Sequence, residues 1–251
     1  MAVAKDDEGR TWLYFGTGRL WSRLDREEPY FSHQNAYYGI KEPVDLDNEM
    51  TYGAVGGKTA TLRNVTGIRI YDYDTILGGS PPVLDQNGDG KVDFSDLVAE
   101  VRAKDGWYLN YSETGERNLG QAAVLGHLVS FTTYLPSNDL CTSEGSSYLY
   151  GLYYKTGTAY VEGALLTAEN NWTGRDGSGL VLPKVYAGKG YTTTPNLHTG
   201  SEAGSVAYVQ TSTGAIIDIE QVNPGVTKSG KLSWREGFDS LREQDDPYEY
   251  Y

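Results

Sequence analysis

The sequence predicts an all-β protein, and three observations carry this prediction. The chain of 251 residues contains 21 Tyr and 31 Gly, residue types that favour strands and turns respectively. Short apolar runs alternate with turn signals made of Gly, Asn, Ser or Thr-Gly along most of the chain. One segment alone, directly after residue 93, shows convincing helical spacing.

The predicted strands are short runs rich in aromatic and aliphatic residues, each bounded by turn-forming residues. In chain order we expect them within residues 11–17, 35–41, 67–73, 107–111, 122–135, 147–154, 159–165, 183–188, 206–211 and 215–222.

A Thr-Gly pair recurs at Thr114, Thr156 and Thr213, each time after one predicted strand and before another. Gly supplies the positive φ that tight hairpin turns need, so we interpret each pair as a hairpin. The first interval is close to the roughly 40–45 residues of one propeller blade. The second is longer, which an inserted loop around NNWTGRDGSG at 170–179 explains. Chance recurrence of Thr-Gly in a Gly-rich β protein is the alternative.

Residues 85–96, DQNGDGKVDFSD, match a calcium loop of the EF-hand type. Calcium prefers six to eight oxygen ligands, and alternate residues of a tight loop can point such oxygens inward. Gly90 occupies position 6, where the loop turns sharply, and Asp96 replaces the usual Glu at position 12. The predicted ligands are Asp85, Asn87, Asp89, the Lys91 carbonyl, Asp93 and Asp96. An acidic surface turn that binds no metal is the alternative.

The flanks of this loop differ. Phe94, Leu97, Val98 and Val101 recur at helical spacing, which predicts a short amphipathic exiting helix. The preceding ILGGSPPVL contains Gly-Gly and Pro-Pro and cannot form an entering helix. We therefore expect half an EF-hand, similar to the loop-plus-helix units of dockerins, inserted at about residues 74–105. A structural clip is favoured over a regulatory signal.

Composition narrows the class of protein. The net charge of −13 argues against nucleic acid or an anionic membrane as partner. Cys141 is the single cysteine, so no intrachain disulfide can form. The N-terminal residues are too polar for a signal peptide, and no apolar run reaches transmembrane length. A calcium clip suits an extracellular setting, so we expect the chain to be a piece of a longer exported protein.

Recognisable catalytic patterns are absent from the sequence. His33, His127 and His198 are scattered and are interpreted as packing or surface residues. Cys141, close to Asp139, is interpreted as a buried, inert thiol. The tryptophans could form a sugar platform, but packing in the core is the favoured interpretation. They are Trp12, Trp21, Trp107, Trp172 and Trp234.

Several phrases together resemble the C-terminal β-propeller region of the PilY family, the calcium-binding proteins of type IV pilus biogenesis and pilus tips. The phrases are LYFGTGRLW (13–21), NAYYGIKEP (35–43), GWYLNYSETGERN (106–118), VSFTTYLPSNDLCTSEGSSYLYGLYYKTG (129–157) and SGKLSWREGF (229–238). Family members are much longer and begin with a variable region and an export signal. The Arg-Gly-Asp motif described for the family is not present in this sequence.

The resemblance implies a single PilY-like propeller domain or fragment over residues 1–251, with about four or five blades. The strand at 11–17 would then lack a neighbour and leave an exposed edge. The implied role is non-enzymatic: pilus assembly, extension-retraction control or cell adhesion at the extracellular fimbrium. The implied partners are pilins or minor pilins, a polypeptide that supplies the missing N-terminal part, or a surface ligand.

Two further expectations concern contact and catalysis. Four tyrosines are candidate contact residues, because Tyr is enriched where interfaces concentrate binding energy; they are Tyr148, Tyr150, Tyr153 and Tyr154. Alternation along a strand would point only half of them outward, while the other half fill the sheet packing. The competing interpretation is an enzyme, either a quinoprotein-like propeller dehydrogenase or a dockerin-bearing glycan hydrolase, which would need convergent carboxylates.

Overall fold

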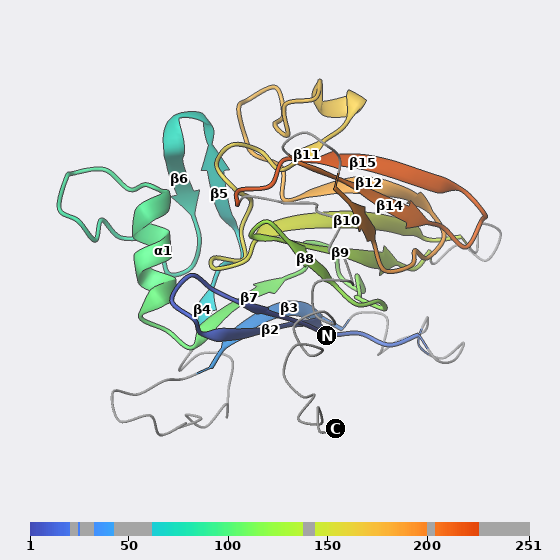
Figure 1. Cartoon of the computed structure of the whole chain (residues 1–251), viewed down its shortest axis with the longest axis horizontal. Helices are drawn as coiled ribbons and strands as arrows, with labels where there is room; N and C mark the ends of the chain where they lie inside the picture. The colour runs from blue at the N-terminus through green and yellow to red at the C-terminus, as the bar shows by residue number, and fades with distance from the viewer. Residues whose placement is uncertain (21–24, 26–32, 43–61, 138–143, 200–203, 226–251) are drawn as a thin grey trace, which may run out of the picture.

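A computed structural model of the chain describes residues 1–20, 25, 33–42, 62–137, 144–199 and 204–225 (Figure 1). Most of the described elements are strands, and they form three sheets of four or five strands and one two-stranded ribbon. The described part contains a single α-helix, α1 (Phe94–Arg102), with the short 3-10 turns η2 (Asp72–Asp74) and η3 (Ala168–Asn170). The all-β prediction is confirmed in this coarse form.

The strands follow one another almost entirely as antiparallel neighbours; the short β4–β7 pair is parallel. The first sheet has the order β1 (Ala2–Lys5), β2 (Thr11–Gly16), β3 (Ala36–Lys41), β7 (Gly106–Asn110), β4 (Arg63–Asn64). The second has the order β12 (Lys184–Lys189), β10 (Ser146–Tyr153), β9 (Leu128–Leu135), β8 (Ala123–Leu125). The third has the order β11 (Leu165–Leu166), β15 (Ile216–Gln221), β14 (Ser205–Gln210), β13 (Asn196–His198). The ribbon pairs β5 (Ile68–Tyr71) with β6 (Thr75–Gly78).

The second sheet lies between the other two, and both of its faces are buried. On one face Phe131 stacks on Tyr37 of the first sheet, with ring centroids 3.6 Å apart, and on its neighbour Tyr150. On the other face Leu149 packs with Val209 of the third sheet in a separate aliphatic cluster. Burial on two faces explains why β9 is buried at nearly every position rather than at alternate ones.

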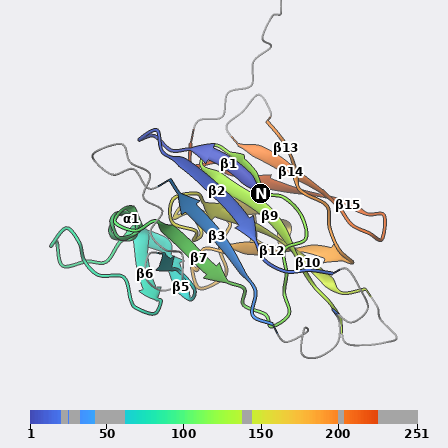
Figure 2. The same ribbon diagram turned by 90° about the horizontal axis from the view of Figure 1, so that it is seen from below.

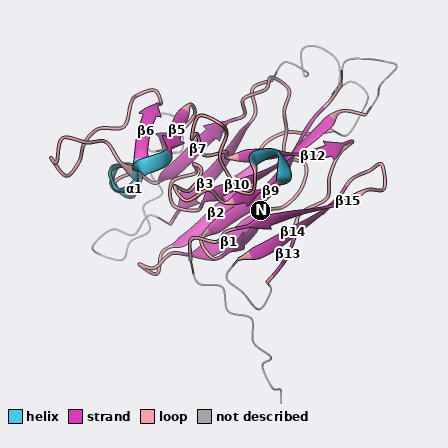
Figure 3. Ribbon diagram, turned by 90° about the horizontal axis from the view of Figure 1, so that it is seen from above, coloured by secondary structure: helices cyan, strands magenta, loops and turns pink. Residues whose placement is uncertain are grey.

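Helix α1 and the ribbon lie together at one end of the molecule, away from strands β13 to β15 (Figures 2 and 3). The apolar side of α1, formed by Leu97 and Val101, packs in the same core cluster as the buried Trp107 of the first sheet. Phe94 makes edge-to-face contacts with Tyr153 and Tyr160, at centroid distances of 5.4 and 5.7 Å. The predicted exiting helix is therefore confirmed, and its apolar stripe is what holds it to the sheets.

The predicted strands are mostly confirmed, although the sequence did not predict β1, β4, β6 and β13. Three of the predictions differ from the structure. The run 122–135 divides into β8 and β9 at a tight turn, where Gly126 and His127 have φ of 51° and 68°. Within residues 159–165 only Leu165 belongs to a strand, the short β11. Gly163 has a φ of 79°, which breaks the extended backbone before it. The strand at 11–17 is not an exposed edge, because β1 pairs with it from Ala2 to Lys5.

The Thr-Gly pairs are confirmed as turns, but only one of them is a hairpin. Gly115, Gly157 and Gly214 have φ of 83°, 68° and 92°, so each turn needs the freedom of glycine. The pair Thr213-Gly214 joins β14 to β15. After Thr156-Gly157 one hydrogen bond, from Tyr153 N to the Thr158 carbonyl, closes the turn, and after Thr114-Gly115 Arg117 bridges to Tyr134 of β9. Among the described residues neither pair joins two strands that pair with each other.

Glu116 and Arg117, from the GER segment, connect several elements. The fully buried Glu116 carboxylate accepts hydrogen bonds from Tyr150 Oη at 2.9 Å and from Lys184 Nζ at 3.1 Å. Arg117 donates to the carbonyls of Arg19 and Asp25 at 2.7 and 2.9 Å. Hydrogen bonds to charged groups are stronger than neutral ones. Glu116 and Arg117 therefore connect β10 and β12 to the segment that follows β2.

Two glycines of the same Thr-Gly motif offer a matched test of core packing. A Cβ at Gly157 would lie 2.2 Å from the Trp107 ring, whereas a Cβ at Gly214 would meet nothing within 4 Å. Both changes to alanine carry the backbone strain of a positive φ. We expect Gly157→Ala to lower the free energy of unfolding by about 1–3 kcal/mol more than Gly214→Ala, as overpacking does. Urea unfolding measures both, and equal losses would contradict the packing described here.

Candidate metal centre

The loop at 85–96 is shaped by its own side chains, which accept backbone N–H groups across the turn. Both oxygens of Asp85 do so, from Gly88 at 2.6 Å and Gly90 at 2.8 Å. Asn87 Oδ1 accepts from Asp89 N at 2.9 Å, and Asp89 Oδ1 from Lys91 N at 2.8 Å. These bonds wind the backbone around the positions that the sequence predicts as metal ligands.

Two glycines allow this winding. Gly88 and Gly90 have φ of 77° and 83°, and a Cβ at either position would meet open space. Their requirement is therefore conformational rather than steric. The sharp turn predicted at Gly90 is confirmed.

The end of the loop is also the start of helix α1. Asp93 is the N-cap and accepts from Ser95 N at 2.8 Å and Asp96 N at 3.3 Å. Asp96 completes a capping box by accepting from Asp93 N at 2.9 Å, and it also accepts from Gln86 N at 2.7 Å. Such reciprocal caps satisfy helix N–H groups that have no partner within the helix.

Asp96 is the buried anion of the loop, with 1% of its surface exposed. The backbone N–H of Asp93, and next that of Gln86, lowers the pKa of the Asp96 carboxyl below its ordinary value. A carboxylate held in this way stays ionised, which is the form a cation requires.

Asp74 lies beside the loop and was not predicted from the sequence. It ends the turn η2 with a φ of 61°, and its Oδ1 accepts from Phe94 N at 3.0 Å. Burial, with the charges of Asp93 and Asp96, raises the pKa of the Asp74 carboxyl. In the sequence, the only hint of this role is that Asp74 is an acidic residue close before the loop.

The ribbon and the helix support the loop where an entering helix is missing. The Ile76 N–H donates to the carbonyl of Val92 at 3.4 Å. Glu100 of α1 accepts from Leu84 N at 2.8 Å and pairs with the buried Arg63 of β4 at 2.8 Å. Both ends of the loop are thus tied to the body of the protein.

The predicted ligand atoms of the loop suit calcium, because all of them are oxygens and the Asp96 carboxylate is held ionised. Among the described residues, however, no three Asp, Glu, His or Cys side chains are grouped as a metal site. The loop carboxylates turn toward backbone N–H groups instead of toward one another. The six-ligand calcium site therefore stays a prediction.

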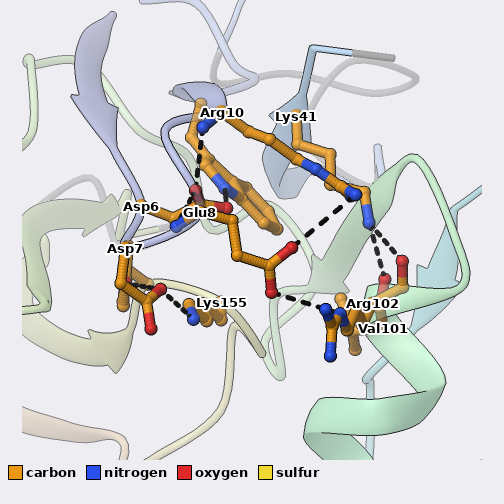
Figure 4. Close-up of polar contacts among 10 residues, drawn as sticks. Asp6, Asp7, Glu8, Arg10, Lys41, Val101, Arg102 and Lys155 are labelled. Atoms are coloured by element: carbon orange, nitrogen blue, oxygen red, sulfur yellow. Dashed lines mark hydrogen bonds and ion pairs between the residues drawn. The ribbon is translucent and has the colours of Figure 1, made fainter. Parts of the chain in front are cut away.

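The far end of α1 is fixed by charged groups, as Figure 4 shows. The Lys41 ammonium donates to the carbonyls of Val101 and Arg102, the final residues of the helix. Glu8 pairs with Arg102 at 3.1 Å and with Arg10 at 3.6 Å. A cation at a helix C-terminus satisfies free carbonyls and opposes the negative end of the helix dipole.

No family model matches the chain. A curated protein named "Type IV pilus biogenesis factor PilY1 homolog", from Xylella fastidiosa (strain Temecula1), is 24% identical over 240 residues. That match covers 91% of this chain but only 16% of the relative's length. The chain also matches the crystal structure of the Pseudomonas aeruginosa PilY1 C-terminal domain with a TM-score of 0.54 and 18% identity. This second match covers 90% of this chain and 44% of that domain.

The resemblance to the C-terminal region of the PilY family is confirmed. The solved PilY1 domain shares the fold, while the curated relative shares sequence along nearly the whole chain. Of the phrases that carried the resemblance, SGKLSWREGF lies outside the described residues, as do Trp21, Trp234, Asp139 and Cys141. None of the described helices has the length and apolar character needed to cross a bilayer.

Of the four candidate contact tyrosines, two are buried and two are partly exposed, in line with the expectation that only half of them point outward. Tyr150 and Tyr154 are 3% and 1% exposed, and Tyr148 and Tyr153 are half-buried. The cause of the burial is the sandwiched position of β10, between the other two sheets. The tryptophan prediction is correct for Trp12 and Trp107 but wrong for Trp172, which is 55% exposed.

The described histidines serve packing or lie at the surface, as expected. His127 stacks on Tyr154, with ring centroids 4.8 Å apart, while His33 and His198 are exposed.

The contact between Lys41 and the C-terminal end of α1 makes the stability of the protein depend on pH. Burial, and next the charge of Arg10, lowers the pKa of Lys41 from 10.5 to about 8. Between these two values the unfolded chain holds a proton that the folded chain lacks, so folded stability rises with pH. We expect the free energy of unfolding of the wild type, relative to Lys41→Met, to increase from about pH 7.5 to about pH 9.5. Urea unfolding at several pH values measures this difference; a difference that stays constant or falls would contradict the lowered pKa of Lys41.

Proposed function

We propose that the chain is a calcium-stabilised part of a β-propeller in a type IV pilus biogenesis protein, and that it acts by binding other molecules. The observation that carries the proposal is the match of 91% of the chain to a protein named as a PilY1 homolog. Because the chain spans only 16% of that relative, the role in the pilus is a property of a longer polypeptide to which this part contributes.

The arrangement of the sheets supports the propeller. The edge strands β1, β8 and β13 each belong to a different sheet, and β8 contacts both β1 and β13. Successive blades around a common axis bring one edge strand of each sheet together in this way. The described residues account for three sheets of blade size, against the four or five blades expected from chain length.

Calcium would bind Asp85, Asn87, Asp89, the Lys91 carbonyl, Asp93 and Asp96, and it would neutralise a cluster of like charges. The role of these residues is to supply oxygens; the role of α1 is to connect them to the sheets. Because Asp93 and Asp96 are both loop residues and helix caps, order in the loop and order in the first turn of α1 depend on each other. Calcium is therefore a structural clip for one end of the domain.

The surface that such a clip would order lies around the loop, the ribbon and the first turn of α1. We propose that this surface holds a pilin, a minor pilin or another part of the same polypeptide at the cell surface. The binding role is supported by the name of the relative, a biogenesis factor, and by the position of the loop at one end of the molecule (Figure 1).

Calcium binding is tested by removing two ligands together. We expect Asp85→Ala with Asp89→Ala to abolish the binding heat that calcium gives with the wild type in calorimetry, since both are loop carboxylates. A matched control is Asp176→Ala, an exposed aspartate that caps a different Gly-rich turn. At a calcium concentration 100 times the dissociation constant, binding adds about 2.7 kcal/mol to the free energy of unfolding. Chelation with EGTA should accordingly lower the melting temperature of the wild type and of the control, but not that of the double variant.

The pilus role is tested in the source organism, with the full-length protein carrying or lacking residues 85–96. We expect deletion of the gene to abolish surface pili and twitching, and the loop deletion to reduce them. Normal piliation, twitching and adhesion after deletion of the gene would overturn the pilus proposal. Purified protein that oxidised an alcohol with a quinone cofactor would replace binding with catalysis.

A further inference from the structure

An apolar pocket lies between strand β5 of the ribbon, the end of β7 and the segment 180–184. Its volume is about 330 Å³, at the small end of the range for ligand sites. At about 30 Å³ for each water-sized group, a pocket of this volume holds a ligand of about eleven non-hydrogen atoms. Most of the side chains that line it are aliphatic; they include Val65, Ile68, Leu109, Ala159, Val181 and Pro183.

Hydrogen bonds between main-chain groups fix the walls of this pocket. Val181 N donates to the Ile70 carbonyl at 2.8 Å, and Gly151 N donates to the Pro183 carbonyl at 3.0 Å. The segment 180–184 is thus attached to β5 on one side and to β10 on the other. A pocket whose walls are fixed in advance loses little conformational entropy when a ligand enters.

The charged groups of the pocket are all cations. Arg69 and Lys184 line it, and none of its lining residues is an Asp or a Glu. The chain as a whole carries a net charge of −13, so the pocket is a local exception. Its lining therefore favours a negative charge over a positive one.

Lys184 lies where the pocket meets a buried anion. Its ammonium donates to Ser112 Oγ at 2.7 Å and to Glu116 Oε2 at 3.1 Å, and it lies 4.3 Å from the centre of the Tyr148 ring. An ammonium has three N–H donors, so one N–H of Lys184 is left without an oxygen acceptor among the described residues. Glu116 offsets only one of the two cations, and one anionic group on a ligand would offset the other.

Size and charge together define the class of ligand. An apolar body of this size removes the aliphatic walls from water, which is favourable in proportion to the area buried. A carboxylate accepts hydrogen bonds and donates none, so it suits the remaining N–H of Lys184. A cationic amphiphile would meet like charges at Lys184 and Arg69, and a neutral one would forgo the charged hydrogen bond.

We propose that this pocket is a binding site for a small apolar carboxylic acid of about the size of octanoate. Its carboxylate meets Lys184, and its apolar body lies against the aliphatic walls. The site uses none of the calcium-loop residues. It adds a small-molecule ligand to the proposed role in pilus biogenesis and does not depend on that role.

Binding is tested by calorimetric titration of the 251-residue chain with octanoate, octan-1-ol and octylammonium, which share an apolar body and differ in charge. We expect octanoate to bind most tightly and octylammonium most weakly. Hexanoate should bind about tenfold more weakly than octanoate, because two methylenes fewer are buried. No binding of octanoate, or octylammonium that binds as tightly as octanoate, would overturn the proposal.

Methyl NMR locates the ligand within the fold. We expect octanoate to shift the methyl signals of Ile68, Leu109 and Val181, which line the pocket. The signals of Val209 and Ile219 should stay unchanged, because these residues belong to the separate aliphatic cluster of the third sheet. Shifts of equal size in both groups, or in the second group alone, would place the acid elsewhere and contradict the assignment.

Variants test the charged contact. We expect Arg69→Gln to weaken octanoate by about threefold, the size of one exposed charge pair. Lys184→Met is combined with Glu116→Gln, so that no unpaired charge stays buried. This double variant should weaken octanoate by about tenfold, the size of one hydrogen bond to a charged group. Unchanged octanoate affinity in the double variant would overturn the role of Lys184.

A matched control is Lys155→Met. Like Lys184, Lys155 pairs with an acid and lies over a tyrosine ring, and the two side chains are similarly exposed, at 16% and 20%. Lys155 does not line the pocket, so octanoate should bind this variant as it binds the wild type. An equal loss in the control would contradict the assignment.

Octan-1-ol separates a contact role of Lys184 from a structural one. It lacks the charge, so it should bind the double variant about as tightly as it binds the wild type. Loss of octanoate and octan-1-ol together would show that Lys184 shapes the pocket, and it would overturn the role of Lys184 as the contact of the carboxylate.

Discussion

Helix α1 is fixed at both of its ends, and the arrangement of this part of the molecule depends on that constraint. At the N-terminus its free N–H groups are capped by Asp93 and by Asp74 from the ribbon. At the C-terminus its free carbonyls are satisfied by Lys41 from the first sheet. A helix of nine residues is too short to be stable by itself. Its existence therefore depends on these caps and on the burial of Leu97 and Val101.

Because α1 is held at both ends, the loop that precedes it is also held to the body of the domain. The loop shares Asp93 and Asp96 with the helix, so its geometry is inherited from a packed element. Glu100 reaches back from the helix to Leu84, the residue just before the loop. Any cation that drew the loop oxygens together would act on α1 directly, and through Lys41 on the first sheet. The loop thus has support on both sides without an entering helix.

Most strands, the turns and the helix could be predicted from the sequence, because each depends on residues that are close together in the chain. Strand-forming runs, the positive φ at Gly157 and Gly214, and the apolar stripe of α1 needed no tertiary information. Burial of the tyrosines did need it: Tyr150 is covered because the second sheet lies between two others, and one strand cannot reveal how many faces are covered. The short β1 was missed because AVAK is only four residues long and carries a charge.

The candidate site follows the same division. Loop positions 85–96 could be predicted from their spacing, but Asp74 meets the loop only through the fold of the ribbon. Sequence alone also assigned Trp172 of NNWTGRDGSG to the core, whereas the structure leaves it 55% exposed. The exposure of this indole follows from the turn that ends η3, where Asn171 is the left-handed C-cap.

The central claim is that the loop and the body of the domain are coupled through α1, and amide hydrogen exchange with and without calcium tests it most directly. The account predicts that calcium slows exchange in the loop, along residues 94–102, and at the clamp around Lys41 and residues 6–10. Slower exchange that stopped at the loop, with unchanged rates in α1 and at the clamp, would contradict the coupling.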